Sequence, residues 1–469
     1  MKGPQLSLPP QAMRAFGYRV VDLIVEHLEQ LANKQPSHCP LRRDLEALLR
    51  EPPPERGEDP QHVLEQAVER VLANIMHVDH PRFFAFVPGP SNFVGAMADA
   101  LAAGFNVFAG SWFSGAGAAQ LELVVLDWIR QLLGLPESAG GLLVSGGSLA
   151  NLTGLATARR AVLEDKLESA VVYFSDQTHS AVLKALRLLG FAPEQMRCLP
   201  CDAGFRLPLE QLCAAIRTDR AAGWRPFCIV ANAGTTNTGA VDPLEELAAL
   251  ARREGLWLHV DGAYGAPAVL TEQGRALLAG IERADSLALD PHKWLFQPFE
   301  AGCVLVREAK LLKQTFRILP EYLQDVHRMQ GAVNFCDYGI QLTRGFRALK
   351  LWMSLKVFGL AAFREAVARG LRLAELAEQR LRASGCWEVV SPAQLAIVCF
   401  RYRDSARTES ELDRLHLDLV ERVLEDGYAV LTSTRLRGQV VLRMCTINPR
   451  TSEAEIEETV ARLERLARR

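Results

Sequence analysis

A lysine and an aspartate stand at the ends of two apolar runs, where their side chains could do covalent chemistry. Lys293 lies in the pentapeptide Asp-Pro-His-Lys-Trp at 290–294, directly after the apolar run 286–289. Asp261 ends the β-prone run 256–260. A lysine that is partly removed from water can form an imine with an aldehyde cofactor. Because a lone lysine after a proline turn is usually a surface residue, this interpretation depends on partners elsewhere in the chain.

Asp261 is such a partner, because the chain between it and Lys293 can hold a crossover and another strand. Two parallel neighbouring strands would bring both side chains to one crevice at their carboxyl ends. A lysine imine and a carboxylate are the pair that pyridoxal phosphate (PLP) needs, since the carboxylate keeps the pyridine nitrogen protonated. At ~4 Å and an effective dielectric constant near 20, that charge pair contributes roughly 4 kcal/mol. The protonated ring can accept electrons from the Cα atom of an amino acid.

Three further segments could hold the same cofactor. The run 140–151 enters a glycine turn at Gly147 and starts a helix near Ser148, and helix N-termini bind phosphate through free N–H groups and the helix dipole. His179, at another strand-to-helix junction, could stack on a flat ring and touch a substrate carboxylate. Thr236 follows a buried strand and could contact the cofactor edge. Taken alone, each segment also fits an ordinary turn or helix start.

Four motifs together resemble a known family. Gly-Gly-Ser-Leu-Ala-Asn, Ser-Asp-Gln-Thr-His-Ser, His-Val-Asp-Gly-Ala-Tyr and Asp-Pro-His-Lys-Trp occur in this order. Their order and spacing are similar to those of the group II PLP-dependent amino-acid decarboxylases, the family of aromatic-L-amino-acid decarboxylase. The resemblance extends from about Pro10 to the C-terminus. It implies the α/β fold type I of PLP-dependent transferases, with a mostly parallel central sheet, and a homodimer whose active sites lie at the subunit interface.

The resemblance also implies a role for each matching residue. Lys293 corresponds to the Schiff-base lysine, Asp261 to the partner of the pyridinium nitrogen, and His179 to the histidine stacked on the ring. Asp290 stands where the animal enzymes usually have asparagine, so its own cofactor contact is in doubt. The implied cofactor-binding set is Gly147, Ser148, His179, Thr236, Asp261, Ala263, Asp290, His292 and Lys293.

A later segment, 318–325, resembles the family's mobile loop, which covers the active site of the partner subunit. Tyr322 falls on the loop tyrosine that returns a proton to Cα after carbon dioxide leaves. A closing loop can supply this donor and exclude water. Related aldehyde synthases carry phenylalanine there, so Tyr322 favours amine formation. The predicted catalytic residues are therefore Lys293, His179, Tyr322 and Asp261, and the sequence leaves open whether His179 or His292 relays protons.

Two aromatic segments match the family's side-chain walls, 80–88 from one subunit and 105–112 from its partner. In this correspondence Phe86, Val87 and Phe108 line the substrate pocket, although any one of them could be plain core. Aromatic walls favour an aromatic substrate by about 0.5–1.5 kcal/mol per good ring pair. The glutamate and cysteine-sulfinate branches carry Asn-Gln where this chain has Ala85-Phe86.

We therefore predict decarboxylation of an aromatic L-amino acid (tryptophan, 5-hydroxytryptophan, DOPA, tyrosine or phenylalanine) to the amine and carbon dioxide. Three alternatives remain at this point. One is a decarboxylase of histidine, glutamate or cysteine sulfinate. The others are an oxygen-consuming aromatic aldehyde synthase and a fold-type I aminotransferase, which shares the lysine, the aspartate and the phosphate turn.

The composition of the chain indicates its broad class. The 469 residues are 49% hydrophobic and 23% charged with a net charge of −2, which is typical of a globular protein without nucleic-acid or membrane partners. The one Cys-x-x-Cys pair, Cys198 and Cys201, has no second pair, so no metal site is predicted. The scattered cysteines predict reduced thiols in the cytoplasm. Helical periodicity and strand–helix alternation predict a dimer-wrapping helical arm at 1–75, a large PLP-binding domain at 76–344 and a small α+β domain at 345–469.

Overall fold

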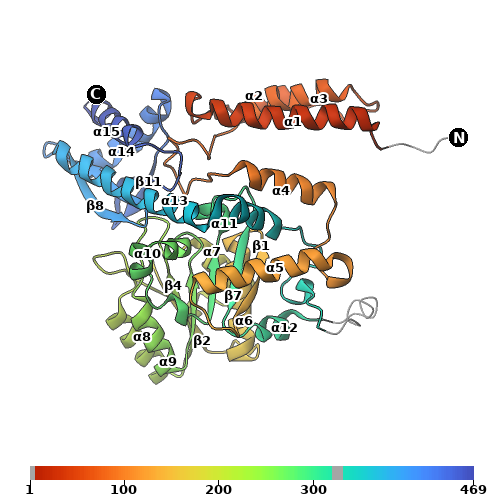
Figure 1. Ribbon diagram of the computed structural model, residues 1–469. Coiled ribbons are helices and arrows are strands. Elements are labelled where there is room, and N and C mark those ends of the chain that lie inside the picture. The colour runs from red at the N-terminus through yellow and green to blue at the C-terminus, as the bar shows by residue number, and fades with distance from the viewer. Residues whose placement is uncertain (1–5, 319–330, 469) are drawn as a thin grey trace.

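The computed structural model describes residues 6–318 and 331–468. Its largest sheet has seven strands in the order β1-β7-β6-β5-β4-β2-β3 (Figure 1). The strands are β1 (Gly140–Val144), β2 (Ala170–Ser175), β3 (Met196–Leu199), β4 (Arg225–Asn232), β5 (Trp257–Asp261), β6 (Ser286–Leu289) and β7 (Gly302–Val306). Only β7 runs antiparallel to its neighbours in this sheet. The predicted mostly parallel sheet and type I fold are confirmed.

Helices cover this sheet, so its central strands are apolar along their whole length rather than alternating. Every residue of β2, β5, β6 and β7 is buried. Helix α6 packs across β5, β6 and β7. The helices of this part are α4 (Phe93–Gly104), α5 (Trp112–Leu132), α6 (Gly147–Leu163), α7 (Ser180–Leu188), α8 (Leu209–Ala221), α9 (Leu244–Glu254), α10 (Glu272–Leu277), α11 (Pro291–Trp294) and α12 (Lys310–Phe316).

A second, antiparallel sheet has the order β10-β11-β9-β8 and lies toward the C-terminus (Figure 1). Its strands are β8 (Trp387–Gln394), β9 (Ile397–Tyr402), β10 (Thr432–Leu436) and β11 (Gln439–Cys445), and the helices beside it are α13 (Ala348–Ser384), α14 (Glu409–Asp426) and α15 (Glu453–Ala467). Although α15 is rich in charged residues, it buries Ile456, Val460 and Leu463, because apolar residues recur at helical spacing between its charges.

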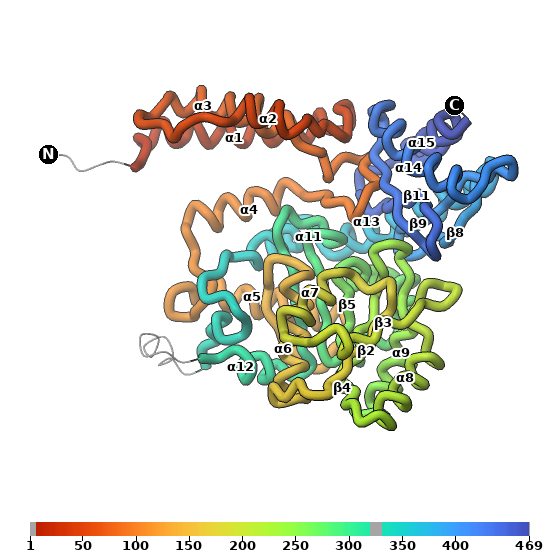
Figure 2. Tube along the Cα trace, turned by 180° about the vertical axis from the view of Figure 1, so that it is seen from behind, coloured from red at the N-terminus to blue at the C-terminus, as the bar shows by residue number. Residues whose placement is uncertain are grey.

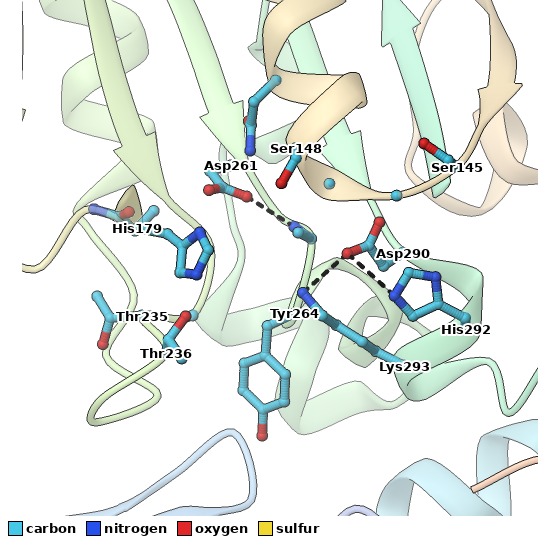
Figure 3. A pocket seen from close by; sticks show the side chains of 16 residues that line it. Ser145, Ser148, His179, Thr235, Thr236, Asp261, Tyr264, Asp290, His292 and Lys293 are labelled. Carbon is cyan, nitrogen blue, oxygen red and sulfur yellow. Dashed lines mark hydrogen bonds and ion pairs between the residues drawn. The ribbon is translucent and has the colours of Figure 1, made fainter. Parts of the chain in front are cut away.

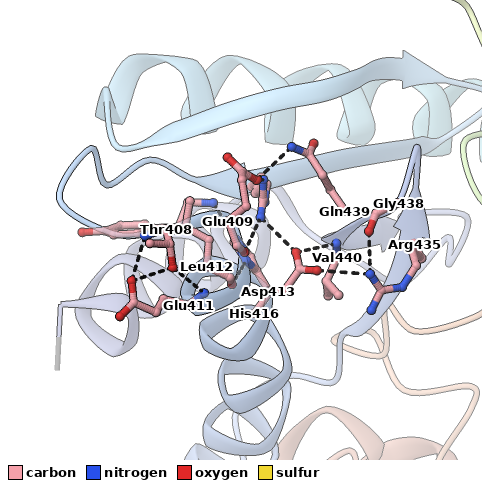
Figure 4. A network of polar contacts seen from close by, with 12 residues as sticks. Thr408, Glu409, Glu411, Leu412, Asp413, His416, Arg435, Gly438, Gln439 and Val440 are labelled. Atoms are coloured by element: carbon pink, nitrogen blue, oxygen red, sulfur yellow. Dashed lines mark hydrogen bonds and ion pairs between the residues drawn. The ribbon is translucent and has the colours of Figure 1, made fainter.

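Polar contacts fix α14 against this small sheet (Figure 4). The helix begins with a reciprocal capping box between Thr408 and Glu411. Arg401 of β9 pairs with Asp413 at 2.9 Å, and Arg435 of β10 reaches the same carboxylate at 3.1 Å. One aspartate thus links two strands to the helix that covers them.

The N-terminal helices α1 (Pro10–Gln30), α2 (Arg42–Leu49) and α3 (Pro60–Gln66) form an arm that projects beside the body (Figures 1 and 2). None of them contains a buried residue. The arm is tied to the body by His80, whose Nε2 lies 3.1 Å from the Lys34 carbonyl oxygen, and by Arg82, which donates to the Ala32 carbonyl at 2.9 Å. The domain boundaries at 75/76 and 344/345 stay predictions. Within the described ranges, the helices are too short or too polar to cross a bilayer.

Candidate active site

A cavity of about 350 Å³ opens where the parallel strands of the large sheet end (Figure 3). Strand ends, turns and helix starts from distant parts of the chain meet there. The lining residues are Ser145, Gly146, Gly147, Ser148, Asn151, His179, Asn232, Gly234, Thr235, Thr236, Asp261, Ala263, Tyr264, Asp290, His292 and Lys293. All nine residues of the predicted cofactor-binding set are among them.

Adjacent parallel strands place the lysine and the aspartate. Asp261, the last residue of β5, pairs in register with Ala288 of β6, and α11 carries Lys293 just after β6. The loop after β5 is held against α11 because Tyr264 stacks on Trp294 with ring centroids 5.3 Å apart. The spacing between the two strand ends is therefore set by sheet register and by a buried aromatic pair.

The two carboxylates of the cavity have different partners. Asp261 is 7% exposed, and its Oδ1 accepts a hydrogen bond from the Ala263 N–H at 3.1 Å. Asp290 is 2% exposed, and its Oδ2 lies 2.9 Å from Lys293 Nζ. The Lys293 side chain keeps 25% of its surface exposed. Its amine is thus held by a carboxylate yet accessible from the cavity.

The turn between β1 and α6 has room for an anion only because Gly146 and Gly147 have no side chains. A Cβ atom on Gly147 would lie 2.9 Å from both the Ala263 Cβ and Asp290 Oδ2, and one on Gly146 would lie 3.2 Å from the His292 ring. Helix α6 starts at Gly147 with Gly146 as its N-cap and has no side-chain cap. Its first N–H groups, left without intrahelical partners, and its dipole therefore face the cavity and suit a phosphate.

Two histidines line the cavity as neutral rings. His179 is the N-cap of α7, and its Nδ1 accepts from the Ala181 N–H at 3.2 Å. His292 Nδ1 accepts from the Ala301 N–H at 3.2 Å. Burial is the main cause that lowers the pKa of both imidazoles. Each ring therefore carries its proton on Nε2, and both can act as hydrogen-bond donors toward the cavity.

Our sequence prediction missed a buried chain of hydrogen bonds beneath the cavity. His259 Nδ1 lies 2.7 Å from Ser286 Oγ, and its Nε2 lies 2.7 Å from Asn151 Oδ1. Trp257 Nε1–H donates to Ser286 Oγ at 2.8 Å. The serine hydroxyl can therefore donate its own proton to His259 Nδ1, and His259 Nε2–H donates to Asn151 Oδ1. Burial lowers the pKa of His259 to about 4. This series of hydrogen bonds links β5, β6 and α6. Its signal in the sequence was that His259 stands two residues before Asp261 on one strand.

Other lining residues missed by the prediction are Ser145, Gly146, Asn151, Asn232, Gly234, Thr235 and Tyr264. Asn232 is held firmly, because its backbone N–H and its Nδ2 both donate to Asp242 Oδ2, at 2.6 and 2.9 Å. Burial raises the pKa of Asp242 to about 6. Most of them stand inside the motif runs 140–151 and 259–264, and that position was the available signal.

The predicted substrate residues do not line this cavity in the single chain. Neither Phe86, Val87 nor Phe108 is among its described lining residues. Phe86 is 61% exposed and has a left-handed φ of 48°. Arg443 of β11, also missed, holds it: one guanidinium nitrogen donates to the Phe86 carbonyl and another to the Thr236 carbonyl. Tyr322 lies outside the described residues.

Comparison with known proteins identifies the chain. Residues 43–403 match the family described as the pyridoxal-dependent decarboxylase conserved domain. The chain belongs to the pyridoxal-dependent decarboxylases. This decarboxylase is 50% identical over 464 residues to an aromatic-L-amino-acid decarboxylase of Bacillus atrophaeus, covering 98% of this chain and 97% of the relative. It is 33% identical to a phenylacetaldehyde synthase of Arabidopsis thaliana, covering 96% of this chain and 94% of that one.

Solved structures agree with this membership. The decarboxylase superposes on Oryza sativa TDC with PLP and tryptamine with a TM-score of 0.94 and 30% identity, over 99% of both chains. It superposes on Rhodiola rosea 4-hydroxyphenylacetaldehyde synthase with a TM-score of 0.91 and 28% identity, over 98% and 99% of the chains. PLP is the cofactor of this family. The cavity fits it, since it combines a glycine turn at a helix N-terminus, an accessible lysine and a buried carboxylate.

Proposed function

We propose that this PLP-dependent enzyme decarboxylates aromatic L-amino acids to the corresponding amines. The observation that carries the proposal is the single cavity in which Lys293, Asp261 and His179 meet. The 50% identity to an aromatic-L-amino-acid decarboxylase supports the substrate class. Bound PLP supplies the electron sink for the bond between Cα and the carboxylate.

The residues of the cavity have separate roles in this reaction. Lys293 offers an accessible amine for covalent attachment of the cofactor. Asp261, nearly excluded from water, stabilises a positive charge at the ring nitrogen; at ~4 Å this contributes roughly 4 kcal/mol. His179 presents a neutral ring whose Nε2–H can donate to a substrate carboxylate. The Gly147–Ser148 turn binds the phosphate group, with Thr236, Ala263, Asp290 and His292 around the cofactor.

Phe86 supports an aromatic substrate. A non-glycine residue in the left-handed region costs of order 1–3 kcal/mol and persists where its surroundings hold it, as Arg443 does here. The side chain is left exposed instead of packed in the core. We infer that Phe86 forms a rim wall with Val87 and the partner subunit's Phe108. Ala85 is fully buried and provides no polar donor for an acidic substrate.

The active unit is proposed to be a homodimer in the cytoplasm. The arm has no buried residue in its three helices, yet it exposes large apolar side chains. They include Met13, Tyr18, Val25, Leu48 and Val63. Such a surface marks a protein interface, and a second copy of the chain is its simplest occupant. The same pairing would bring Phe108 and Tyr322 of one chain to the cavity of the other.

Tyr322 decides between two products. We propose that it returns the proton to Cα and so yields the amine. The second candidate, an oxygen-consuming aldehyde synthase, is favoured by the likeness to two aldehyde synthases. Tyr322 argues against it, because a phenol can donate the proton that a phenylalanine at this position cannot.

The test is product analysis on purified protein with added PLP. Tryptophan, 5-hydroxytryptophan, DOPA, tyrosine and phenylalanine are compared with histidine, glutamate and cysteine sulfinate, and carbon dioxide, amine and peroxide are measured. We expect equal amounts of carbon dioxide and amine from an aromatic substrate. Preference for a non-aromatic substrate contradicts the proposed class. Equimolar peroxide identifies an aldehyde synthase, and a requirement for a keto acid identifies an aminotransferase.

A further inference from the structure

Asp290 places a carboxylate against the turn that we assign to the cofactor phosphate. A Cβ atom on Gly147 would lie 2.9 Å from Asp290 Oδ2, so the carboxyl group lines the anion cradle itself. It is 2% exposed, and its Oδ1 has no hydrogen-bond partner among the described residues. The buried oxygen is therefore available to a group that enters the cavity (Figure 3).

Lys293 balances this charge fully only while it is an ammonium group. Its Nζ lies 2.9 Å from Asp290 Oδ2, and it is the single permanent cation among the described lining residues. Covalent attachment of the cofactor, which is part of the proposed function, leaves that nitrogen with at most one proton, so it no longer serves Asp290 as an ammonium group. At the same moment the phosphate adds negative charge beside the carboxyl group.

His292 is not a replacement cation. Its Nε2 lies 3.7 Å from Asp290 Oδ2, but its Nδ1 accepts a hydrogen bond from the Ala301 N–H. If Nδ1 also carried a proton, its N–H would face the Ala301 N–H and the two donors would repel, so the ring stays neutral. Burial also lowers its pKa.

The other elements around Asp290 bring no cation either. From the end of β5 comes Asp261, a second carboxylate, and from the start of α7 comes the neutral His179. From β7 comes Cys303, whose thiol pKa is raised well above its ordinary value by burial. Helix α6 contributes glycine backbone and the Ser148 hydroxyl. Two like charges ~4 Å apart repel by roughly 4 kcal/mol at an effective dielectric constant near 20, so one of the pair takes up a proton.

We propose that Asp290 and a phosphate oxygen share one proton in a hydrogen bond when phosphorylated cofactor is bound. The proton is taken from solvent when the phosphate binds and is returned when it leaves. An asparagine amide, usual here in the animal enzymes, would donate without titrating. This enzyme therefore differs in making its cofactor affinity depend on pH through the phosphate. The inference rests on the proposed PLP site.

The experiment compares cofactor binding by wild-type apoenzyme and Asp290→Asn between about pH 7 and 9, where a phosphate monoester is a dianion. The dissociation constants of PLP and of pyridoxal, which lacks the phosphate, are measured at each pH. For one shared proton, the PLP dissociation constant of the wild type should rise up to about tenfold per pH unit relative to the variant. Pyridoxal should show no such difference, because it brings no anion to the cradle.

A second measurement needs no variant. Calorimetric titration of the wild type in buffers of different ionisation enthalpy counts protons, and we expect about one more proton taken up with PLP than with pyridoxal. Equal pH slopes for wild type and Asp290→Asn, or equal proton uptake for the two ligands, overturn the proposal. A wild type that binds PLP without forming the visible absorbance band of a lysine-linked cofactor contradicts the proposed function itself, and this inference with it.

Discussion

The cofactor cavity and the predicted substrate wall are built in opposite ways. The cavity is lined by strand ends of one sheet, and its charged groups Asp261 and Asp290 are almost fully buried. The wall residue Phe86 is 61% exposed, and its backbone is hydrogen-bonded to the side chains of Arg443 and Thr432 in the small sheet. A single chain thus contains the groups for cofactor chemistry, whereas substrate recognition is expected to need a second copy. Each prediction below separates these two regions.

The largest effect is expected in the cavity, from Lys293→Ala. Loss of the accessible amine removes both covalent attachment and a proton-transfer group, and proton transfer alone contributes about 10²–10⁴-fold. We expect turnover to fall by at least about 10³-fold and the absorbance band of the lysine-linked cofactor to disappear. Borohydride trapping of cofactor on the variant polypeptide would show that another residue is the attachment site. Lys184→Ala, outside the cavity lining, serves as the control.

Asp261→Asn should have the next largest effect. The change keeps the size of the side chain but removes the charge that faces the ring nitrogen. Since such a pair contributes up to roughly 4 kcal/mol, a fall in turnover of about 10²–10³-fold is expected, with weaker PLP binding. The absorbance band should persist because Lys293 is intact. Near-normal turnover would contradict the role of Asp261 as ring partner.

A charge on the arm should affect turnover without destroying the cofactor site. Leu48→Glu puts a carboxylate on the proposed dimer surface, whereas Leu417→Glu, similarly exposed on α14, is the matched control. We expect Leu48→Glu to shift sedimentation toward monomer and to lower turnover by about tenfold, the effect of 1.4 kcal/mol. The cofactor band should survive in both variants. A Leu48→Glu variant that stays dimeric would exclude this surface as the interface.

The smallest effect concerns stability in acid. Burial lowers the pKa of His259 below the cavity and of His80 beside the arm to about 4 each. The unfolded chain therefore binds more protons between about pH 6.5 and 4, and the free energy of unfolding falls as the pH falls through that window. Each histidine should remove roughly 1.4 kcal/mol by pH 5.5.

Urea unfolding of wild type and His259→Gln at pH 7 and 5.5 measures this term. Glutamine cannot titrate, so the variant should lose less stability on acidification than the wild type, whatever its stability at pH 7. Equal losses would show that His259 is not buried as a neutral ring.

The strands that carry the chemistry were predictable because they are continuous apolar runs ended by polar residues, as at Asp261 and Asp290. Their motifs also indicated the family. The antiparallel direction of β7 was not predictable from its own residues. The link after β6, residues 290–301, contains only the four-residue helix α11, which does not span the sheet as the helix of a parallel crossover does.

Contacts between distant segments account for the rest. The pairing of His259 with Asn151 depends on how α6 crosses the sheet, and no local pattern encodes that crossing. Arg443 of β11 reaches both Phe86 and Thr236, which are far from it and from each other in sequence. By contrast, the contact between Asp290 and Lys293 follows from their three-residue spacing in a helical turn and could have been anticipated.

A mixed-dimer experiment tests the division between the two regions most directly. Lys293→Ala and Tyr322→Phe chains are dissociated together, reassociated and assayed for amine. If Lys293 of one chain works with Tyr322 of the other, each mixed dimer has one complete site and one site that lacks both residues. Mixed dimers make up half of a random mixture, so about a quarter of the wild-type amine yield should return. An amine yield no higher than the average of the two parent variants would contradict the account.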